Sequence, residues 1–284
     1  MELEAKESLL MRDFRWLTQS PSLLENTPIF FKEWARKEMI PPIPERLFEL
    51  RRAPIGRYFE AVVSLWLDHQ EGVNRLESNI PLRDGKVTLG ELDLLFEVEG
   101  VAYHWELAFK LYLGVGDRKK TWNWHGPLGR DRLDIKLAKL YDKQLKTLES
   151  KEGIECLAHR GMKDATSHAL VKGALFYPYE AWCQNQFDSP VEIDTSHDKG
   201  WWIHLGSFQK VAIQNRRWRI LPKSDWLSPA IGGTLFDSSE LLTKLTEKFN
   251  SDSRAVLLGL FDKNDEEKER GFVVPNDWAP CPAS

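Results

Sequence analysis

Apolar and polar residues alternate along much of residues 75–113. The alternation is interrupted at Asp84-Gly85 and at Glu99-Gly100, two dipeptides that are typical of tight turns. Because successive side chains of a strand point to opposite faces of a sheet, the pattern predicts three antiparallel strands joined by two hairpins.

Apolar residues at helical spacing flank these strands on both sides. One helix is predicted to begin at Pro54, which suits a first helical turn, and a second covers residues 129–149, where leucines form the core stripe. Residues 169–178 form an apolar run that predicts a buried strand. The predicted order is helix, three antiparallel strands, helix, strand. Glu60 lies close to the apolar stripe of the helix that begins at Pro54. The stripe consists of Ile55, Phe59, Val62, Val63 and Trp66.

The two ends of the chain have other patterns. Residues 1–50 look helical up to a group of prolines at positions 41, 42 and 44. Asp237 and Glu240 have the spacing of a capping box at the start of a helix. The whole chain is therefore predicted to be a mixed α/β (α+β) protein. In its C-terminal part we expect a helix at 237–249 and strands at 201–206, 210–221, 254–261 and 270–275.

The hairpin at Glu99-Gly100 brings two acidic residues together. If these two residues form the turn, counting outward along both strands places Asp93 opposite Glu106. Directly opposed residues have Cβ atoms about 4.5–5.5 Å apart, so two carboxylates there repel each other. Solvent, Lys110 or a divalent cation could offset the repulsion. Glu60 would be a third carboxylate at this point if its helix packs on the charged face.

The charged face of this hairpin allows a second interpretation. Antiparallel sheets often expose one face to water, and charged residues are ordinary there. However, Leu95 and Ala108 interrupt the charges, and two helices with apolar stripes flank the hairpin. A helix that covers this face would leave the charges partly buried and in need of partners.

Two segments of the chain resemble a known family. They are HWELAFKLYL at 104–113 and GPLGRDRLDIKLAKLYDKQL at 126–145. With the predicted element order, they resemble the bacterial domain-of-unknown-function family 1853, which is grouped with the PD-(D/E)XK nuclease superfamily. The resemblance implies a restriction-endonuclease-like core at 51–180. With the patterns at the two ends, this predicts an N-terminal helical segment at 1–50 and a mixed α/β extension at 181–284 packed on the core.

The resemblance also implies a site and a reaction. By position, Asp93, Glu106 and Glu60 match the metal-binding acids, and Lys110 matches the catalytic lysine. The superfamily pattern has its lysine two residues after the second acid, where this chain has Ala108. The implied reaction is hydrolysis of a phosphodiester in nucleic acid, in DNA rather than RNA, with Mg²⁺ or Mn²⁺ as cofactor. The alternative is a nuclease-like module that has lost catalysis and binds nucleic acid or a protein partner.

Basic residues within the predicted 129–149 helix suggest how nucleic acid would bind. Their spacings of four, three, four and three predict one stripe along the helix, and contacts from it to phosphates would make binding salt-dependent. A solvated helix face explains the same pattern. Gln144 lies near the inner stripe, either as a partner of the acids or as a buried hydrogen-bonded side chain. The stripe consists of Arg132, Lys136, Lys139, Lys143 and Lys146.

Composition limits the other possibilities. The net charge of −4 gives no global basic field, and the three cysteines have no metal-finger spacing, which argues against structural zinc and fits a reducing compartment. The sequence shows no signal-peptide pattern and no apolar run of about 20 residues, so we expect a cytoplasmic protein without a membrane partner. The oligomeric state is not predicted. A sugar- or protein-binding surface is a further, minor possibility at Trp201, Trp202, Trp218 and Trp226.

Overall fold

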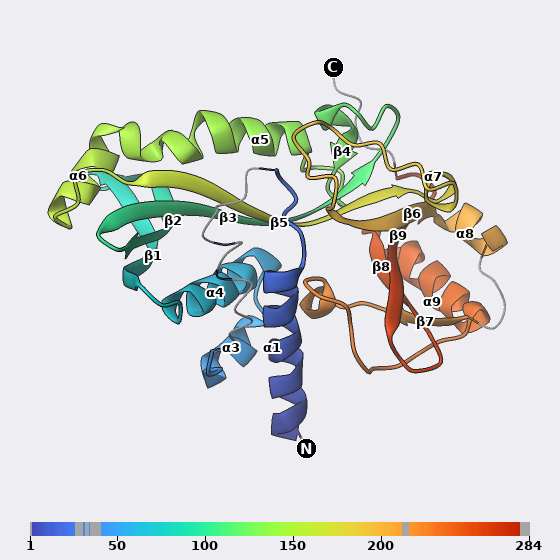
Figure 1. The fold of residues 1–284 in the computed structure, drawn as a ribbon. Coiled ribbons are helices and arrows are strands. Elements are labelled where there is room, and N and C mark those ends of the chain that lie inside the picture. Colours follow the sequence, from blue (N-terminus) through green and yellow to red (C-terminus); the bar gives the residue numbers. More distant parts are fainter. Residues whose placement is uncertain (1, 26–30, 32–33, 35–40, 212–215, 279–284) are drawn as a thin grey trace. The chain divides into compact units, whose positions relative to one another are not determined.

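The computed structural model describes residues 2–25, 31, 34, 41–211 and 216–278, with side chains in the first helix from residue 9 onward. Within these residues the protein is a mixed α/β fold with eight α-helices and a nine-stranded mixed sheet (Figure 1). The strands follow the order β1-β2-β3-β5-β6-β9-β8-β7, and β4 pairs with β3. None of the described helices is long and apolar enough to cross a bilayer.

The strands are β1 (Val73–Asp84), β2 (Val87–Val98), β3 (Val101–Gly114), β4 (Trp124–His125), β5 (Thr166–Pro178), β6 (Asp198–His204), β7 (Arg217–Ile220), β8 (Val256–Phe261) and β9 (Glu267–Val274). The helices are α1 (Glu2–Gln19), α3 (Glu45–Leu50), α4 (Ile55–Asp68), α5 (Leu133–Asp142), α6 (Lys151–His159), α7 (Tyr179–Cys183), α8 (Leu205–Val211) and α9 (Ser238–Ser251). Three short 3₁₀ helices are η1 (Thr121–Asn123), η2 (Gln144–Glu149) and η3 (Lys223–Asp225).

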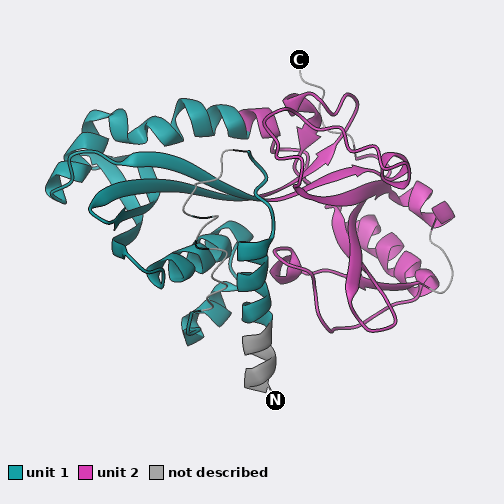
Figure 2. Cartoon of the chain, viewed as in Figure 1, with its two compact units in different colours: residues 1–109, 136–172 teal, residues 110–135, 173–284 magenta. Residues whose placement is uncertain are grey.

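The chain forms two compact units, and each is described separately (Figure 2). Unit 1 consists of residues 1–109 and 136–172, and unit 2 of residues 110–135 and 173–284. Each unit is a group of residues that contact one another more than they contact the rest of the chain. The division at residues 50 and 180 that the sequence suggests, and the packing of residues 181–284 on the core, stay predictions.

The β2–β3 hairpin of unit 1 has the predicted register. Glu99 and Gly100 both have positive φ, 52° and 81°, as a two-residue type I′ turn requires. Val98 pairs with Val101, and the pairing continues without a shift to Leu94 and Trp105. The prediction of three consecutive antiparallel strands is therefore confirmed.

Helices cover both faces of the strands in unit 1, as Figure 1 shows for α4 and α6. On one face, Phe59 of α4 packs on Phe109 of β3, with ring centroids 6.2 Å apart. On the other face, leucine, cysteine and methionine side chains of η2, α6 and the residues after it form a buried cluster with the strands. Its members are Ile80, Leu82, Leu92, Leu95, Ala102, Leu148, Cys156, Leu157 and Met162.

The continuous helix predicted for residues 129–149 is wrong. The α5 helix ends at Asp142, Lys143 leaves helical geometry with φ −127° and ψ −63°, and η2 follows. Beyond this break, α6 packs directly against η2. A Cβ on Gly153 of α6 would meet the Thr147 carbonyl oxygen at 2.4 Å, too close for any other residue. The leucine spacing continues across this break and does not reveal it.

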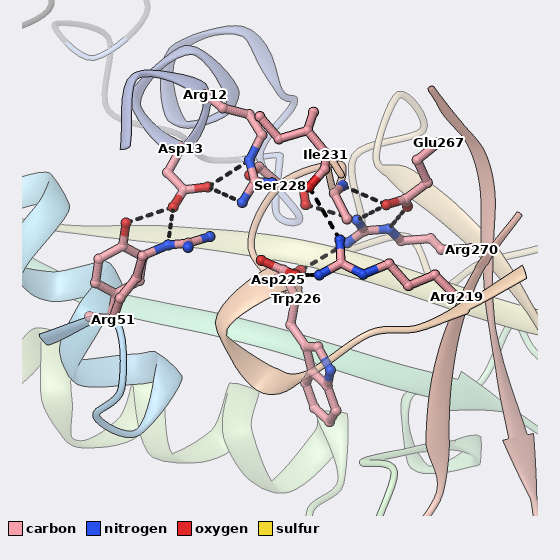
Figure 3. Close-up of polar contacts among 12 residues, drawn as sticks. Arg12, Asp13, Arg51, Arg219, Asp225, Trp226, Ser228, Ile231, Glu267 and Arg270 are labelled. Carbon is pink, nitrogen blue, oxygen red and sulfur yellow. Dashed lines mark hydrogen bonds and ion pairs between the residues drawn. The ribbon is translucent and has the colours of Figure 1, made fainter. Parts of the chain in front are cut away.

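A buried acid of α1 helps to place α4, which carries Glu60. Asp13 accepts hydrogen bonds from the Tyr58 hydroxyl at 2.6 Å and from Arg51 Nε at 3.2 Å (Figure 3). Burial raises the pKa of Tyr58 above its usual range, and the charge of Asp13 adds to the effect. Tyr58 therefore stays protonated and continues to donate to Asp13.

Unit 2 contains the remainder of the sheet. The strand pair predicted at 254–261 and 270–275 is confirmed as antiparallel β8 and β9. The capping box of Asp237 and Glu240 is also confirmed, with both hydrogen bonds formed at the start of α9. Arg270 pairs with Glu267 at 2.5 Å and donates to the Trp226 and Ser228 carbonyls at 2.9 Å, which fixes the loop beside β9 (Figure 3).

Two strand predictions in unit 2 need correction. The strand predicted at 201–206 ends at His204, because Leu205 already begins α8. Of the strand predicted at 210–221, only Arg217–Ile220 pairs, with β8. Lys210 and Val211 end α8, and residues 212–215 lie outside the described residues. A short apolar run fits a strand or a buried helix, so the periodicity of the sequence does not distinguish the two.

Candidate functional site

Asp93 and Glu106 lie directly beyond the last backbone pair of the β2–β3 hairpin. That pair is Leu94 with Trp105, so Asp93 and Glu106 occupy the next position on each strand. There the backbone N–H of Leu107 donates to Asp93 Oδ2 at 2.8 Å. The side chain of Asp93 is therefore fixed against the neighbouring strand.

The electrostatics of Asp93 show that acidic groups converge at this point. Burial raises the pKa of Asp93 to about 7. The negative charges of Glu106 and Glu60 add to this rise in the pKa, while the Leu107 N–H and the charge of Lys136 oppose it. Asp93 is thus a carboxyl group whose ionised form is disfavoured by both its burial and its neighbours.

Glu60 joins the same electrostatic group from α4. Its pKa is raised first by burial and then by the charges of Glu91 and Glu106, and it is lowered by Arg57. The expectation that α4 packs on the charged face of the hairpin is wrong, because the contact of Phe59 with Phe109 places it on the apolar face. Glu60 nevertheless comes within electrostatic range of Asp93 and Glu106.

Glu106 is held by hydrogen bonds to both carboxylate oxygens. It is 1% exposed. His104 Nε2 lies 3.0 Å from Glu106 Oε1, and Gln144 Nε2 donates to Glu106 Oε2. Lys136 Nζ donates to Gln144 Oε1 at 3.0 Å, so the amide lies between a cation and a carboxylate. This arrangement assigns the orientation of the Gln144 amide.

A cleft of about 1080 Å³ in unit 1 opens beside these acids. Glu60 and Asp93 line it, together with Glu91 of β2. Its walls come from α3, α4, β1, β2, α5 and η2, and they bring positive charge to the same space. The basic residues that line the cleft are Arg46, Arg57, Lys139 and Lys143.

Lys110 is engaged elsewhere. Its Nζ lies 2.5 Å from Asp131 Oδ2, in an ion pair that is partly exposed. Lys136 is instead the lysine that acts on the charge of Asp93. The structure therefore places a cation from α5 beside the acids, and places Lys110 in a separate pair.

The five predicted nucleic-acid-binding residues do not form one helical stripe. Arg132 precedes α5 and pairs with Asp134 through two hydrogen bonds, at 2.8 and 2.7 Å. Lys136 and Lys139 belong to α5, whereas Lys143 and Lys146 follow its end. Lys139 and Lys143 line the cleft, and Lys146 is exposed. Their role in binding nucleic acid stays a prediction.

Three residues at this site did not emerge as site residues from the sequence. Arg57 lies one helical turn before Glu60, and this spacing could have revealed it. His104 shares the charged face of β3 with Glu106, but a single histidine there is ordinary. Ser167 of β5 lies 3.0 Å from His104 Nδ1, and no feature of the sequence indicates this long-range contact.

The donor set decides which kind of metal fits. In the part of the chain that the structure describes, no three His, Cys, Asp or Glu side chains form a group that could hold a metal by themselves. Mg²⁺ commonly takes one or two carboxylates and keeps several waters, and Mn²⁺ also favours oxygen ligands. Asp93 at the cleft, with the Glu106 carboxylate buried beside it, fits such a cation and does not fit a site closed by protein ligands.

Comparisons with known proteins identify one relationship. The family described as "Domain of unknown function (DUF1853)" matches residues 12–274. No curated protein and no solved structure matches the chain.

Proposed function

The chain belongs to the DUF1853 family, and from this premise we propose that it is a metal-dependent nuclease with a PD-(D/E)XK-type core. The observation that carries the proposal is the convergence of Glu60, Asp93 and Glu106: burial, and after it the charges of neighbouring acids, raises the pKa values of Glu60 and Asp93 beside a cleft. Such perturbed acids in a cleft are characteristic of functional sites.

The element order supports a restriction-endonuclease-like topology for the core. The succession of α4, β1–β3, α5 and β5 matches the order implied by the resemblance. The additional elements are β4, η1, η2 and α6, which lie between β3 and β5 in the chain. We propose that the three-stranded unit with α4 and α6 on opposite faces is the scaffold of the active site.

Each residue of the site has a distinct task in the proposed reaction. Asp93 and Glu106 would hold Mg²⁺ or Mn²⁺, with Glu60 adding negative charge nearby. When bound, the cation supplies a water of lowered pKa and stabilises charge on the phosphate. Leu107 holds Asp93 in place through its N–H. Lys136, whose positive charge acts on Asp93, would stabilise the negative charge that develops on the phosphate.

The substrate proposed for this cleft is nucleic acid. The basic side chains on its walls come from two directions, Arg46 and Arg57 from α3 and α4, and Lys139 and Lys143 from α5 and the residue after it. Such cations neutralise backbone phosphates. DNA is the first substrate to test, following the resemblance stated above.

An assay of the full chain on single- and double-stranded DNA and RNA tests this function. We expect DNA to be cleaved in the presence of Mn²⁺ or Mg²⁺ and to stay intact in EDTA, because the carboxylates act only through a bound cation. The absence of cleavage of all four substrates with either metal would contradict the proposal.

Two lysine variants show which lysine side chain supports the reaction. We expect Lys136→Met to lower the cleavage rate about 100-fold, because it removes positive charge at the acids. Lys110→Met should leave the rate close to that of the wild type, since Lys110 pairs with Asp131. The measurement is single-turnover cleavage with Mn²⁺. The reverse order of effects would show that Lys110 is the functional lysine.

One observation favours a second candidate function, an inactive nuclease-like module that binds nucleic acid or a protein partner. Ala108 stands where the superfamily pattern has its lysine, and Lys110 is paired away. This candidate predicts nucleic-acid binding that is salt-dependent, needs no metal and is unaffected by loss of Asp93. Binding of that kind without cleavage would favour it over the nuclease.

A further inference from the structure

A chain of hydrogen bonds leads from β5 to the Glu106 carboxylate, and the proposed reaction does not use it directly. His104 Nε2 lies 3.0 Å from Glu106 Oε1, and His104 Nδ1 lies 3.0 Å from the Ser167 hydroxyl oxygen. The His104 side chain is 0% exposed, and that of Glu106 is 1% exposed. Since both side chains are almost completely buried in the metal-free chain, the hydrogen bonds of the protein determine their orientation.

The chemistry of the three groups assigns the donors. An ionised carboxylate can only accept, so His104 Nε2 donates to Glu106. In a neutral imidazole the other nitrogen then accepts, and the Ser167 hydroxyl donates to Nδ1. The carboxylate of Glu106 therefore selects the tautomer of His104, and the hydrogen bond to Ser167 fixes the other side of the ring.

We infer that His104 is a positioning residue, which together with Ser167 holds the Glu106 carboxylate in the orientation that lets it share a divalent cation with Asp93. The inference rests on the proposed function. Gln144 holds the second oxygen of Glu106, so each oxygen accepts one hydrogen bond from the protein. Each carboxylate oxygen keeps a further acceptor site.

Substitutions at His104 separate this role from simple filling of space. The amide of Gln can place a donor near the position of Nε2, whereas the shorter Asn reaches only the region of Nδ1. Loss of a residue that orients a metal ligand lowers metal affinity about 10–100-fold, and we expect this for His104→Asn. His104→Gln should restore most of the affinity. Ser167→Ala should cause a smaller loss, because it removes only the hydrogen bond that fixes the ring at Nδ1.

The test is calorimetric titration of Mn²⁺ into the full chain and its variants. His168→Gln is the matched control, because His168 follows Ser167 in β5 and stacks on Tyr103, with ring centroids 6.3 Å apart. We expect weaker Mn²⁺ binding in His104→Asn and in Ser167→Ala, and wild-type binding in His168→Gln. Thermal unfolding shows which variants are folded. If His104→Asn does not fold, the comparison of Ser167→Ala with His168→Gln still tests the inference.

The outcomes distinguish this inference from the proposed function. Wild-type Mn²⁺ affinity in His104→Asn and Ser167→Ala, together with loss of binding in Asp93→Asn, would overturn the positioning role alone. Equal losses in His104→Asn and His104→Gln would also overturn it, because a donor at Nε2 would then be irrelevant. Failure of the wild type to bind Mn²⁺, or binding that Asp93→Asn leaves intact, would overturn both.

Discussion

Replacing Asp93 with Asn is expected to lower Mn²⁺-dependent cleavage by about three orders of magnitude, the effect of removing several kcal/mol of metal-based stabilisation. Asn preserves the shape of Asp93 and can still accept the hydrogen bond that Leu107 donates at 2.8 Å. The variant therefore changes the charge at the site and leaves the local fold in place. The rate should be measured under single-turnover conditions with saturating Mn²⁺.

The matched control for this variant is Glu91→Gln. Glu91 lies two residues before Asp93 on β2, lines the same cleft and is exposed. Its substitution removes one negative charge from the cleft and should leave cleavage close to the wild-type rate. If Glu91→Gln lowers cleavage as strongly as Asp93→Asn, the effect comes from the general charge of the cleft, and Asp93 has no special role.

The second large effect is a loss of stability as the pH rises. The pKa of Asp93 is about 7 in the folded chain and 3.8 as an ordinary Asp, so the folded state binds this proton more tightly than the unfolded state. Its contribution is fully present below pH 3.8 and is lost as the pH rises through 7. Without divalent metal, the free energy of unfolding should fall by roughly 2–4 kcal/mol across this window.

Chemical denaturation in EDTA between pH 4 and 8 measures this dependence. Asp93→Asn should be less sensitive to pH than the wild type, because it lacks the ionisable group. Mn²⁺ should stabilise the wild type at pH 8, where Asp93 is ionised, and should stabilise Asp93→Asn much less. Identical pH dependence in the two proteins would show that Asp93 ionises without penalty, and would remove the electrostatic basis of the site.

Local sequence patterns were sufficient to predict the hairpin and its register up to Leu94 and Trp105. The Glu99-Gly100 dipeptide can adopt positive φ at both positions, and this fixes the turn and with it the register up to Leu94 and Trp105. Asp93 and Glu106 are the next residues on the two strands, and there the Leu107 N–H donates to the Asp93 side chain, a contact that the turn does not predict.

Features that depend on contacts between distant segments could not be predicted. The apolar stripe of α4 shows that it packs on a sheet, but only the contact of Phe59 with Phe109 shows on which face. The α5 helix ends at Asp142 although the leucine spacing continues, and the close approach of Gly153 to Thr147 that follows is a contact between segments that the pattern does not show. Ser167 reaches His104 across 63 positions of the chain.

The most direct test of the account is anomalous diffraction from crystals of the wild-type protein grown with Mn²⁺. We expect an anomalous peak from a Mn²⁺ ion in the cleft, coordinated by carboxylate oxygens of Asp93 and Glu106, and no such peak in crystals of Asp93→Asn. An empty cleft in the wild type, or a Mn²⁺ ion that neither carboxylate contacts, would contradict it.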